Sequence, residues 1–490
     1  MIAAFLIWLG LMLNTTVSAQ SLDGHPKQEV RAAWITTAYG LDWPKTRATS
    51  ADNRQKQQQE LIEMLDKLKA AHFNTILFQV RTRGEVFYNS PSEPMSSLLT
   101  GRINGSPGYD PLQFMVEECH KRGMECHAWI VTIPLGGRRH MTSLGKQAVT
   151  SKQSGITLLY RGEYFLDPSN PKTKEYLMKL VNEIIQNYDV DGVHFDYLRY
   201  PEHLRQFPDQ RQFRRDARGR SYAQWHLDNI TEIVRYLYKG VKAQKPWVKV
   251  SSSPVGKSHD LTRYSSKGWN ALETVSQDVQ GWLGEGIQDQ IYPMMYFSGN
   301  NFYPFALDWQ EQSNGRQVIP GLGIYFLDPK EGDWSIEEIE RQINFTRNQG
   351  LSGQGHYRVQ YLMDNTKGLY DRLYYQYYAY PALIPSMPWL DSIAPSVPLA
   401  LKKEVETDGY THLSWQASTD NDTQNAPMYV IYASDSYPVD TNDASNIIAQ
   451  RIKETHYTYA PIAPWDQKLY FAVSAIDRYG NESEAVQLTR

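Results

Sequence analysis

The residues with the clearest chemical potential lie between positions 191 and 201. A short apolar run there ends at Asp196, and Tyr197 and Arg199 follow before a proline. Alternation along a strand puts His194 and Asp196 on the same side. Carboxylates at the ends of strands line the mouth of (β/α)8 barrels, where catalysis takes place. Asp196 is therefore the first catalytic candidate, and a hydrogen-bonded structural aspartate is the alternative interpretation.

A second carboxylate is needed if the chain hydrolyses glycosidic bonds, because that chemistry usually takes an acid together with a base or nucleophile. Glu85 follows the second expected strand and should lie at the same mouth. The nearby Arg81 could hold it ionised, although a loop salt bridge is the alternative. Asp167, which precedes a proline, is more typical of a turn. Three other acids are set aside: Asp110 as a helix cap, Asp191 as a turn residue, and Asp289 because it lies at the wrong end of its strand.

Aromatic residues are abundant, with 33 Tyr and 13 Trp. Their amphipathic rings suit carbohydrate clefts, because sugars present C–H faces that stack on them, although a barrel and a β-sandwich also consume aromatics. For His127 the competing interpretation is a core histidine with satisfied hydrogen bonds. The predicted substrate-binding residues are Arg81, His127, Trp129, His194, Tyr197, Arg199, Tyr296, Tyr325 and Tyr357.

Charge and ligand patterns argue against several classes of function. Lys and Arg number 50 against 54 Asp and Glu, and no basic stripe indicates nucleic-acid binding. His127, His194 and Asp196 could together ligate a metal, but no other residues complete an ordered ligand set. We therefore expect no metal and no cofactor. A polysaccharide substrate is the expected partner, and the sequence does not identify a protein partner.

Strand and helix patterns alternate over residues 28–384. The expected strands are 30–36, 75–81, 125–131, 192–197, 249–254, 289–297, 317–325 and 353–358, several of them continuous apolar runs typical of a parallel sheet. Helices are expected at 58–71, 111–122, 171–188, 224–242 and 335–349. This order predicts an α/β fold, a (β/α)8 TIM barrel. A doubly wound open sheet is the alternative, weakened because no glycine-rich phosphate loop follows the first strand.

The pattern changes after a proline-rich linker at residues 385–398. Residues 399–490 show short alternating strands at 411–415, 428–433 and 468–476, separated by turn clusters. They predict a small all-β, immunoglobulin-like sandwich of about 90 residues. Trp415, Tyr429, Tyr432, Tyr470 and the run 477–483 resemble the fibronectin type III fold.

Residues 1–19 have the features of a secretory signal peptide. Their apolar segment, 2–13, is too short to span a bilayer, and a small-residue cleavage site follows it. We therefore expect export to a periplasm or the cell exterior, with no transmembrane segment in the mature chain. The two cysteines, Cys119 and Cys126, are expected as buried free thiols. A disulfide is the alternative, disfavoured by the geometry of a helix end and the following strand.

Motifs in a fixed order along residues 28–384 resemble the glycosyl-hydrolase-like family ten, also described as family 10 glycosylhydrolase-like proteins. The motifs occupy residues 29–37, 41–44, 99–101, 107–112, 120–123, 127–129 and 188–196. The resemblance implies a (β/α)8 barrel, export, and glycosidase activity on envelope polysaccharide, including peptidoglycan glycan strands. It also places Asp196 on the family's strand-four acid and Glu85 where the family often has an acid.

Three departures from the family pattern concern the second carboxylate and the substrate. Tyr197 follows Asp196, where the family often doubles the acid. Residues 130–133 replace an Asn-Pro-Tyr-Arg stretch, and Met294 follows Pro293 where the family has Gln. The sequence thus predicts an exported glycoside hydrolase that uses Asp196 and Glu85. The alternative is a catalytically inactive glycan-binding or scaffolding barrel of the cell envelope.

Overall fold

The computed structural model describes residues 25–202, 206–266, 268–407, 409–461, 468 and 470–488. The expected signal peptide, residues 1–19, lies outside these residues. No helix in the described part of the chain is long and apolar enough to cross a membrane.

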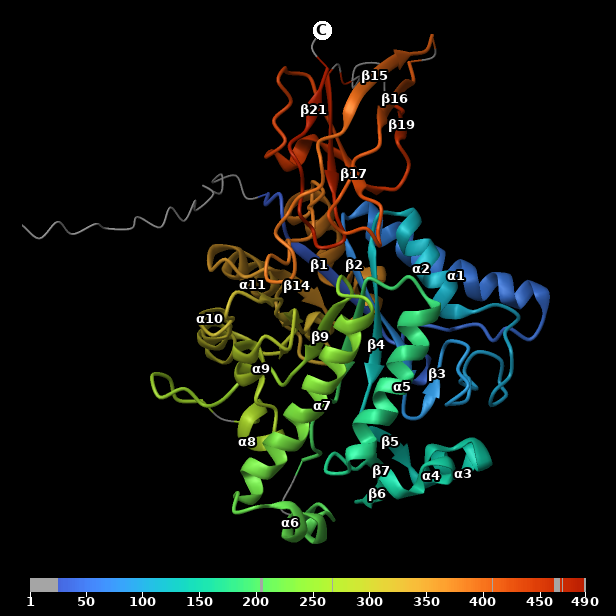
Figure 1. Ribbon diagram of the computed structural model, residues 1–490, viewed down its shortest axis with the longest axis vertical. Coiled ribbons are helices and arrows are strands. Elements are labelled where there is room, and N and C mark those ends of the chain that lie inside the picture. Colours follow the sequence, from blue (N-terminus) through green and yellow to red (C-terminus); the bar gives the residue numbers. More distant parts are fainter. Residues whose placement is uncertain are drawn as a thin grey trace, which may run out of the picture.

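Parallel strands form the centre of the larger part of the chain (Figure 1). Six of them run unbroken: β1 (Val30–Ile35), β2 (Thr75–Thr82), β4 (Glu125–Val131), β8 (Gly192–Asp196), β9 (Lys249–Ser253) and β14 (Gly353–His356). The expected strands at 289–297 and 317–325 are each split, into β10 (Gln290–Ile291) with β11 (Met294–Met295), and β12 (Gln317–Val318) with β13 (Gly321–Leu322). Pro293 and Pro320 lie at the breaks, because proline has no N–H to donate to the sheet.

The strand order supports a TIM-like barrel. Hydrogen bonding follows β11-β13-β14-β1-β2-β4-β8-β9-β10-β12. Because β10 and β11 are halves of one strand, as are β12 and β13, the parallel β10–β12 and β11–β13 pairs join the two ends of this order. An open doubly wound sheet, the alternative prediction, would leave two unpaired edges.

Helices cover the outside of the parallel strands (Figure 1). Five lie close to their expected positions: α1 (Ala51–Ala70), α2 (Pro111–Lys121), α5 (Pro171–Asn187), α7 (Tyr222–Gln244) and α11 (Ile336–Asn348). Asp110 and Asn170 accept backbone N–H groups at the starts of α2 and α5, as their Asp-Pro and Asn-Pro sequences predict. The sequence patterns missed shorter helices: α8 (Ala271–Val275), α9 (Val279–Glu285), α10 (Tyr303–Glu311), α12 (Val359–Met363) and α13 (Leu369–Arg372).

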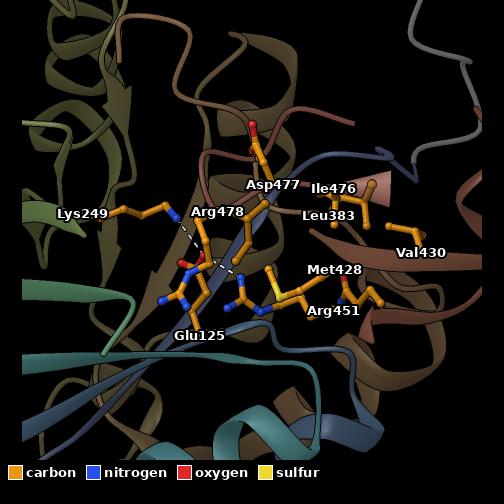
Figure 2. Close-up of a pocket in the computed structure, with 12 residues that line it drawn as sticks. Glu125, Lys249, Leu383, Met428, Val430, Arg451, Ile476, Asp477 and Arg478 are labelled. Atoms are coloured by element: carbon orange, nitrogen blue, oxygen red, sulfur yellow. Dashed lines mark hydrogen bonds and ion pairs between the residues drawn. The ribbon is translucent and has the colours of Figure 1, made fainter. Parts of the chain in front are cut away.

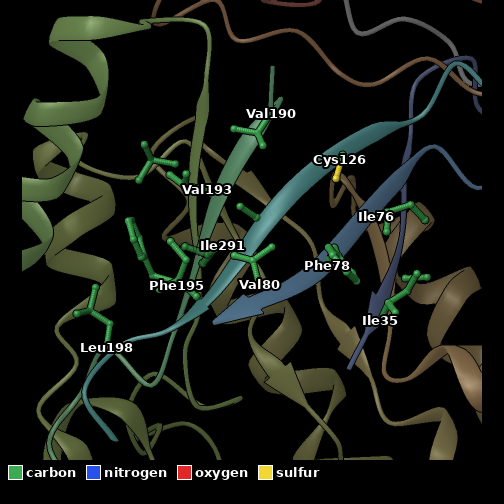
Figure 3. Close-up of a cluster of buried hydrophobic side chains, with 14 of the residues drawn as sticks. Ile35, Ile76, Phe78, Val80, Cys126, Val190, Val193, Phe195, Leu198 and Ile291 are labelled. Atoms are coloured by element: carbon green, nitrogen blue, oxygen red, sulfur yellow. The ribbon is translucent and has the colours of Figure 1, made fainter. Parts of the chain in front are cut away.

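Alternation along the strands separates two apolar layers. Ile76, Phe78 and Val80 of β2 belong to the large core between strands and helices, together with residues of β8 such as Phe195 (Figure 3). Leu77 belongs instead to a second cluster that contains Trp34, Trp129 and Tyr292. This second cluster fills the interior of the barrel, as expected for inward-facing side chains. The same alternation turns His194 and Asp196 inward, away from Phe195.

An insertion of irregular structure follows β4. It contains a small antiparallel sheet of β5 (Pro134–Gly137), β7 (Glu163–Leu166) and β6 (Thr157–Tyr160), with α3 (Arg138–Leu144) and α4 (Val149–Lys152) beside it. A short helix, α6 (Gln210–Asp216), follows β8. These elements lie at one end of the molecule, beyond the C-terminal end of β4 (Figure 1). They were not expected from the sequence, because the three strands have only four residues each and lie in an irregular insertion.

Two antiparallel sheets lie at the opposite end (Figure 1). One contains β15 (Leu399–Val405), β16 (Thr411–Gln416) and β19 (His456–Tyr459), and the other β18 (Ile447–Ile452), β17 (Met428–Ser434), β20 (Tyr470–Ile476) and β21 (Val486–Gln487). A shared core joins them, and it includes Leu413, Trp415, Tyr429 and Phe471. The three strands expected from the sequence are present as β16, β17 and β20.

Ion pairs join these sheets to the N-terminal ends of the barrel strands. Arg451 donates to Glu125, at the start of β4, at 3.1 Å and also pairs with Asp191. Lys249, at the start of β9, belongs to the same network, because its Nζ lies 2.7 Å from Glu125 Oε1. Figure 2 shows Glu125, Lys249 and Arg451 around a pocket between the two parts of the chain. Because this pocket lies at the N-terminal face, it is far from the end of β8 where Asp196 lies.

Cys119 and Cys126 are both buried free thiols, as expected. A hydrogen bond with Cys119, and then burial, raises the pKa of the Cys126 thiol well above its usual value. The Cys126 thiol is therefore a poor nucleophile.

Candidate active site

The carboxylate of Asp196 is held by three donors at the C-terminal end of β8. Its Oδ2 accepts from Trp129 Nε1 at 3.1 Å, and its Oδ1 accepts from Ser253 Oγ at 3.1 Å and from the Tyr197 backbone N–H at 2.7 Å. The strand register explains this arrangement, because Asp196 pairs with Val131 of β4 on one side and with Ser253 of β9 on the other. The neighbouring strands, and not a flexible loop, thus orient the carboxyl of Asp196.

Burial raises the pKa of Asp196, and the nearby Arg199 guanidinium and the three donors oppose this effect only in part. The carboxyl is 6% exposed, so little water reaches it to stabilise its charge. A carboxyl with a raised pKa can remain protonated at a pH where an ordinary aspartate is ionised. Asp196 is therefore suited to donate a proton to a leaving group.

The chain turns sharply directly after Asp196. Tyr197 adopts a left-handed backbone conformation with φ +52°, which is uncommon for a residue with a side chain. The strand ends at Asp196 for this reason, one residue earlier than expected. Leu198 and Tyr200 are buried and fix the turn, while the ring of Tyr197 remains 41% exposed. The Arg199 guanidinium lies over that ring, 4.6 Å from its centroid.

Three tyrosines from the last three strand positions lie on the other side of the mouth. The rings of Tyr296 and Tyr357 are nearly parallel with centroids 5.2 Å apart, and Tyr325 meets both edge-on. Burial is the main cause that raises the pKa of Tyr296 and of Tyr357, and the charge of Asp196 raises both further. The tyrosines therefore face the same space as Asp196. Contact between these rings and a sugar stays a prediction.

Two predicted substrate-binding histidines lie inside the barrel instead. His194 has no exposed surface, with Nδ1 2.9 Å from Ser251 Oγ and Nε2 accepting from Trp34 Nε1 at 3.4 Å. Burial holds the pKa of His194 well below its usual value, so the ring is neutral. His127 is also fully buried and pairs with Glu125 at 3.0 Å. The structure does not support substrate contact by either ring, and the core interpretation of His127 describes its position.

Arg81 was expected to contact substrate, and the structure places it inside the protein. Its side chain is completely buried, with Nε and Nη2 donating to Glu93 at 2.8 Å and 2.7 Å. Its Nη1 donates to the backbone carbonyls of Val131 and Thr132. All of these partners are internal, so Arg81 fastens the end of β2 to the end of β4. The sequence could not show this role, because Glu93 comes from an irregular segment.

Glu85 lies in a separate environment from Asp196. It belongs to β3 (Glu85–Val86), which pairs antiparallel with the end of β2. Its Oε1 accepts from the Ser97 backbone N–H at 3.1 Å, and its Oε2 lies 3.6 Å from His140 Nε2. Burial is the main cause that raises the pKa of Glu85. Among the described hydrogen bonds, Glu85 and Asp196 share no partner.

Asp167 and Asp289, the turn candidate and one of the acids that were set aside, have structural roles. Asp167 accepts from the backbone and hydroxyl of Ser169 at 3.0 Å and 2.6 Å, as a turn aspartate does. Asp289 accepts from the Val250 backbone N–H at 2.8 Å and pairs with Lys242 at the start of its strand. Within the described residues, no group of three or more His, Cys, Asp or Glu side chains is arranged to hold a metal ion.

Two mouth residues were missed from the sequence. Trp269 is 46% exposed, and the Arg199 guanidinium lies 6.0 Å from its ring centroid. It belongs to the irregular connection between β9 and α8, where no periodic pattern exists to indicate its direction. Glu202 follows Pro201, and its charge contributes to raising the pKa of Tyr197. Glu202 is therefore a second carboxyl at the end of β8.

Three comparisons with known proteins show what the chain is similar to. Residues 29–326 match the family described as Glycosyl hydrolase-like 10. The glycosyl hydrolase YngK of Bacillus subtilis (strain 168) is 30% identical over 508 residues, which covers 100% of this chain and 96% of that protein. The glycosyl hydrolase DigH of Escherichia coli (strain K12) is 31% identical over 349 residues, 65% of this chain and 80% of that one. The PgaB (BpsB) glycoside hydrolase domain from Bordetella bronchiseptica has 14% identity and a TM-score of 0.45, covering 71% of this chain and 98% of that structure.

Proposed function

The chain belongs to the glycosyl hydrolase-like 10 family and is a glycoside hydrolase, and we propose that it acts on a bacterial envelope polysaccharide after export. Peptidoglycan glycan strands are the leading candidate substrate, on the basis of the family resemblance of its motifs. The observation that carries the proposed chemistry is the Asp196 carboxyl, buried at a strand end with a raised pKa and surrounded by aromatic rings.

In the proposed mechanism Asp196 is the general acid. Its proton passes to the glycosidic oxygen as the bond to the sugar C1 breaks, while C1 bonds to the second carboxylate or to a water that this carboxylate activates, and Asp196 is left ionised. The donors Trp129, Ser253 and the Tyr197 N–H then stabilise that negative charge. Trp129 therefore acts on the carboxyl directly, and the exposed face of Tyr197 is available to stack against a sugar.

The second carboxyl of this proposal has two candidates. Glu85 lies after β2, at the same end of the barrel as Asp196. Glu202 lies closer in the chain, beside Tyr197. Carboxyl groups about 5–5.5 Å apart predict retention of configuration at C1, whereas about 6.5–9.5 Å predicts inversion. Replacing each glutamate by glutamine separates the two assignments.

We also propose that residues 399–490 form a fibronectin type III-like module. The two antiparallel sheets with a shared core support this assignment. The ion pairs of Arg451 and Arg478 with Asp191 place the module on the face opposite Asp196. Its role is accordingly to stabilise the barrel or to dock the enzyme, and not to complete the catalytic centre.

A catalytically inactive glycan-binding barrel is the second candidate function. One observation favours it, because Tyr197 occupies the position after Asp196 where relatives often have a second acid. The two functions differ in what they release from a polysaccharide. The test is to incubate the purified chain with peptidoglycan glycan strands, chitin oligomers and mannan, and to measure both binding and new reducing ends. New reducing ends from one of these polymers support the hydrolase, whereas binding without any release supports the binding protein.

A further inference from the structure

Two segments at the end of the barrel where Asp196 lies have a charge opposite to that of the whole chain. The chain has a net charge of −4. Residues 134–166, which follow β4, contain five Arg or Lys and one Glu, and residues 206–220, which follow β8, contain five Arg and two Asp. We call these two segments together the basic rim. The balanced composition of the whole chain therefore conceals a strongly basic region.

Contacts between the two segments make the basic rim one continuous surface. Arg161 Nη2 donates to Gln206 Oε1 at 2.9 Å. The ring of Phe207 packs against the rings of Tyr160 and Phe165, with centroids 5.5 Å and 6.3 Å apart. The helices α3, α4 and α6, which belong to the rim, lie at the same end of the molecule (Figure 1). A single extended ligand can therefore contact both segments.

The exposed cations of the basic rim lack counter-charges. Nine of them are exposed: Arg138, Arg139, Lys146, Lys152, Arg161, Arg211, Arg214, Arg215 and Arg218. Among the described residues, only Arg215 of these nine forms an ion pair, with Asp216 at 3.5 Å. The other two acids of the rim are engaged elsewhere, because Glu163 lies 3.7 Å from Arg83 and the buried Asp209 lies 2.9 Å from His226. Eight exposed cations thus remain without a described carboxylate.

The short helix α6 shows that these cations also repel one another. Arg211, Arg214 and Arg215 are spaced i, i+3 and i+4, so they lie on one face of α6. Like charges at this spacing destabilise a helix, and their Cβ atoms are only about 5–6 Å apart. A ligand with closely spaced negative charges removes this repulsion. The charge pattern of α6 therefore favours a polyanion over a single small anion.

The side chains of the basic rim favour one class of polyanion. Among the described residues of the rim, no large apolar or aromatic side chain is exposed. The rim therefore lacks both the aromatic platforms on which single-stranded nucleic acids stack and the apolar side chains that enter a bilayer interface. The arginine fork matches phosphate oxygens in a bidentate manner. A phosphodiester chain with small repeats carries one charge in every repeat, which suits closely spaced arginines better than a glycan with carboxylates on alternate sugars.

We propose that the basic rim binds an anionic phosphodiester polymer with small, non-aromatic repeats, such as a poly(glycerol phosphate) chain. This inference goes beyond the proposed hydrolysis and does not rest on it, because the binding requires no turnover. The polymer lies beside the mouth of the barrel and leaves Asp196 free. Binding holds the mouth close to any polysaccharide that is linked to the polymer or mixed with it.

The test is titration of the full-length chain with poly(glycerol phosphate) at several salt concentrations. If the rim holds about four phosphates, the logarithm of the affinity falls with the logarithm of salt with a slope of about −2.8, so binding weakens about 50-fold between about 50 and 200 mM salt. Polygalacturonate, which carries carboxylates, and oligothymidylate, which carries phosphates and aromatic bases, should each bind at least ~10-fold more weakly. Uncharged mannan should not show this salt dependence.

A charge-matched pair of variants locates the binding surface. The rim variant combines Arg138→Gln, Arg139→Gln, Arg211→Gln and Arg214→Gln. It should bind poly(glycerol phosphate) at least ~30-fold more weakly and with a flatter salt slope. The control combines Lys56→Gln, Arg102→Gln, Lys179→Gln and Lys239→Gln, which are also exposed, form no described ion pair, and change the net charge equally. The control should stay within about 3-fold of wild type, because its positions lie outside the rim.

Replacing the four rim arginines by lysine separates charge from fork recognition. This variant should keep the salt slope but lose part of the affinity, because lysine is a point charge without the bidentate fork. Equal weakening in the rim variant and the control would overturn the inference, and so would binding of polygalacturonate or oligothymidylate as tight as that of poly(glycerol phosphate). Absence of binding by wild type at low salt would also overturn it. If the rim variant does not fold, Arg139→Gln alone replaces it, with Arg102→Gln as its control.

Discussion

The hydroxyl of Ser253 offers a direct test of how the fold sets the acidity of Asp196. Ser253→Ala removes one donor to Oδ1, at 3.1 Å, and changes almost no volume. A hydrogen bond to a charged group contributes about 1.5–3 kcal/mol, and one pKa unit corresponds to about 1.4 kcal/mol. Taking the lower end for a bond of this length, the pKa of Asp196 should rise by about one unit.

The sign follows from which form the hydroxyl favours. Ser253 donates to the ionised carboxylate more strongly than to the neutral acid, so its loss disfavours ionisation. If Asp196 must be protonated to act, the alkaline limb of kcat/KM moves upward by about one pH unit. Trp129→Phe, which removes the donor to Oδ2, should move the limb in the same direction.

The assay is kcat/KM against pH on a cleaved glycan, with Ser251→Ala as the matched control. Ser251 lies two residues earlier on the same face of β9 and bonds His194 instead of Asp196. Its replacement should leave the limb in place. A limb that does not move in Ser253→Ala, that moves downward, or that moves equally in both variants would refute the reasoning.

Three further predictions concern stability and the second carboxyl. Burial raises the folded-state pKa of Asp196 above its value in the unfolded chain, so wild-type stability falls as pH rises from the unfolded-state pKa to the folded-state pKa. Asp196→Asn should lack this decline in stability. Chemical denaturation of both proteins at acidic and neutral pH measures the difference. Arg451→Gln should cost about 1.5–3 kcal/mol of unfolding free energy, because it removes the cation that bridges Glu125 and Asp191 in a buried network, although Lys249 and Arg478 still face these acids. The half-exposed Lys453→Gln should cost less than about 1 kcal/mol, and equal losses would contradict a buried network. Of Glu85→Gln and Glu202→Gln, one should lower kcat by about 100-fold or more with little change in melting temperature, and activity retained in both would remove glutamate from the mechanism.

Much of the fold follows from local patterns in the sequence. Continuous apolar strands and the Asp-Pro and Asn-Pro helix starts are short-range features, and the structure contains them where they were expected. The breaks at Pro293 and Pro320 also have a local cause, since proline cannot donate to a sheet. The antiparallel sheet after β4 could not be expected, because short strands in an irregular insertion depend on contacts made by distant residues.

The candidate site could likewise be predicted only in part from local sequence patterns. Alternation correctly turns His194 and Asp196 to the same side of β8, but it does not give depth within the barrel. Depth decides the outcome, because His194 packs against Trp34 while Asp196 lies at the strand end. Arg81 and Trp269 depend on irregular segments, so their burial and exposure required the three-dimensional structure. Only the ends of strands could be assigned to the mouth from sequence alone.

The most direct measurement of the central claim is turnover by Asp196→Asn on the polymer that the wild-type chain cleaves. Asp167→Asn is the matched control, because Asp167 is also a buried aspartate with a pKa raised mainly by burial, yet its carboxylate bonds Ser169 and Gln212 instead of the donors that hold Asp196. If Asp196 is the general acid, its replacement lowers kcat by about 10²–10⁴-fold with KM little changed, while Asp167→Asn stays within about 10-fold of wild type. Wild-type turnover in Asp196→Asn, with the same products, would contradict the assignment of Asp196 as the catalytic acid.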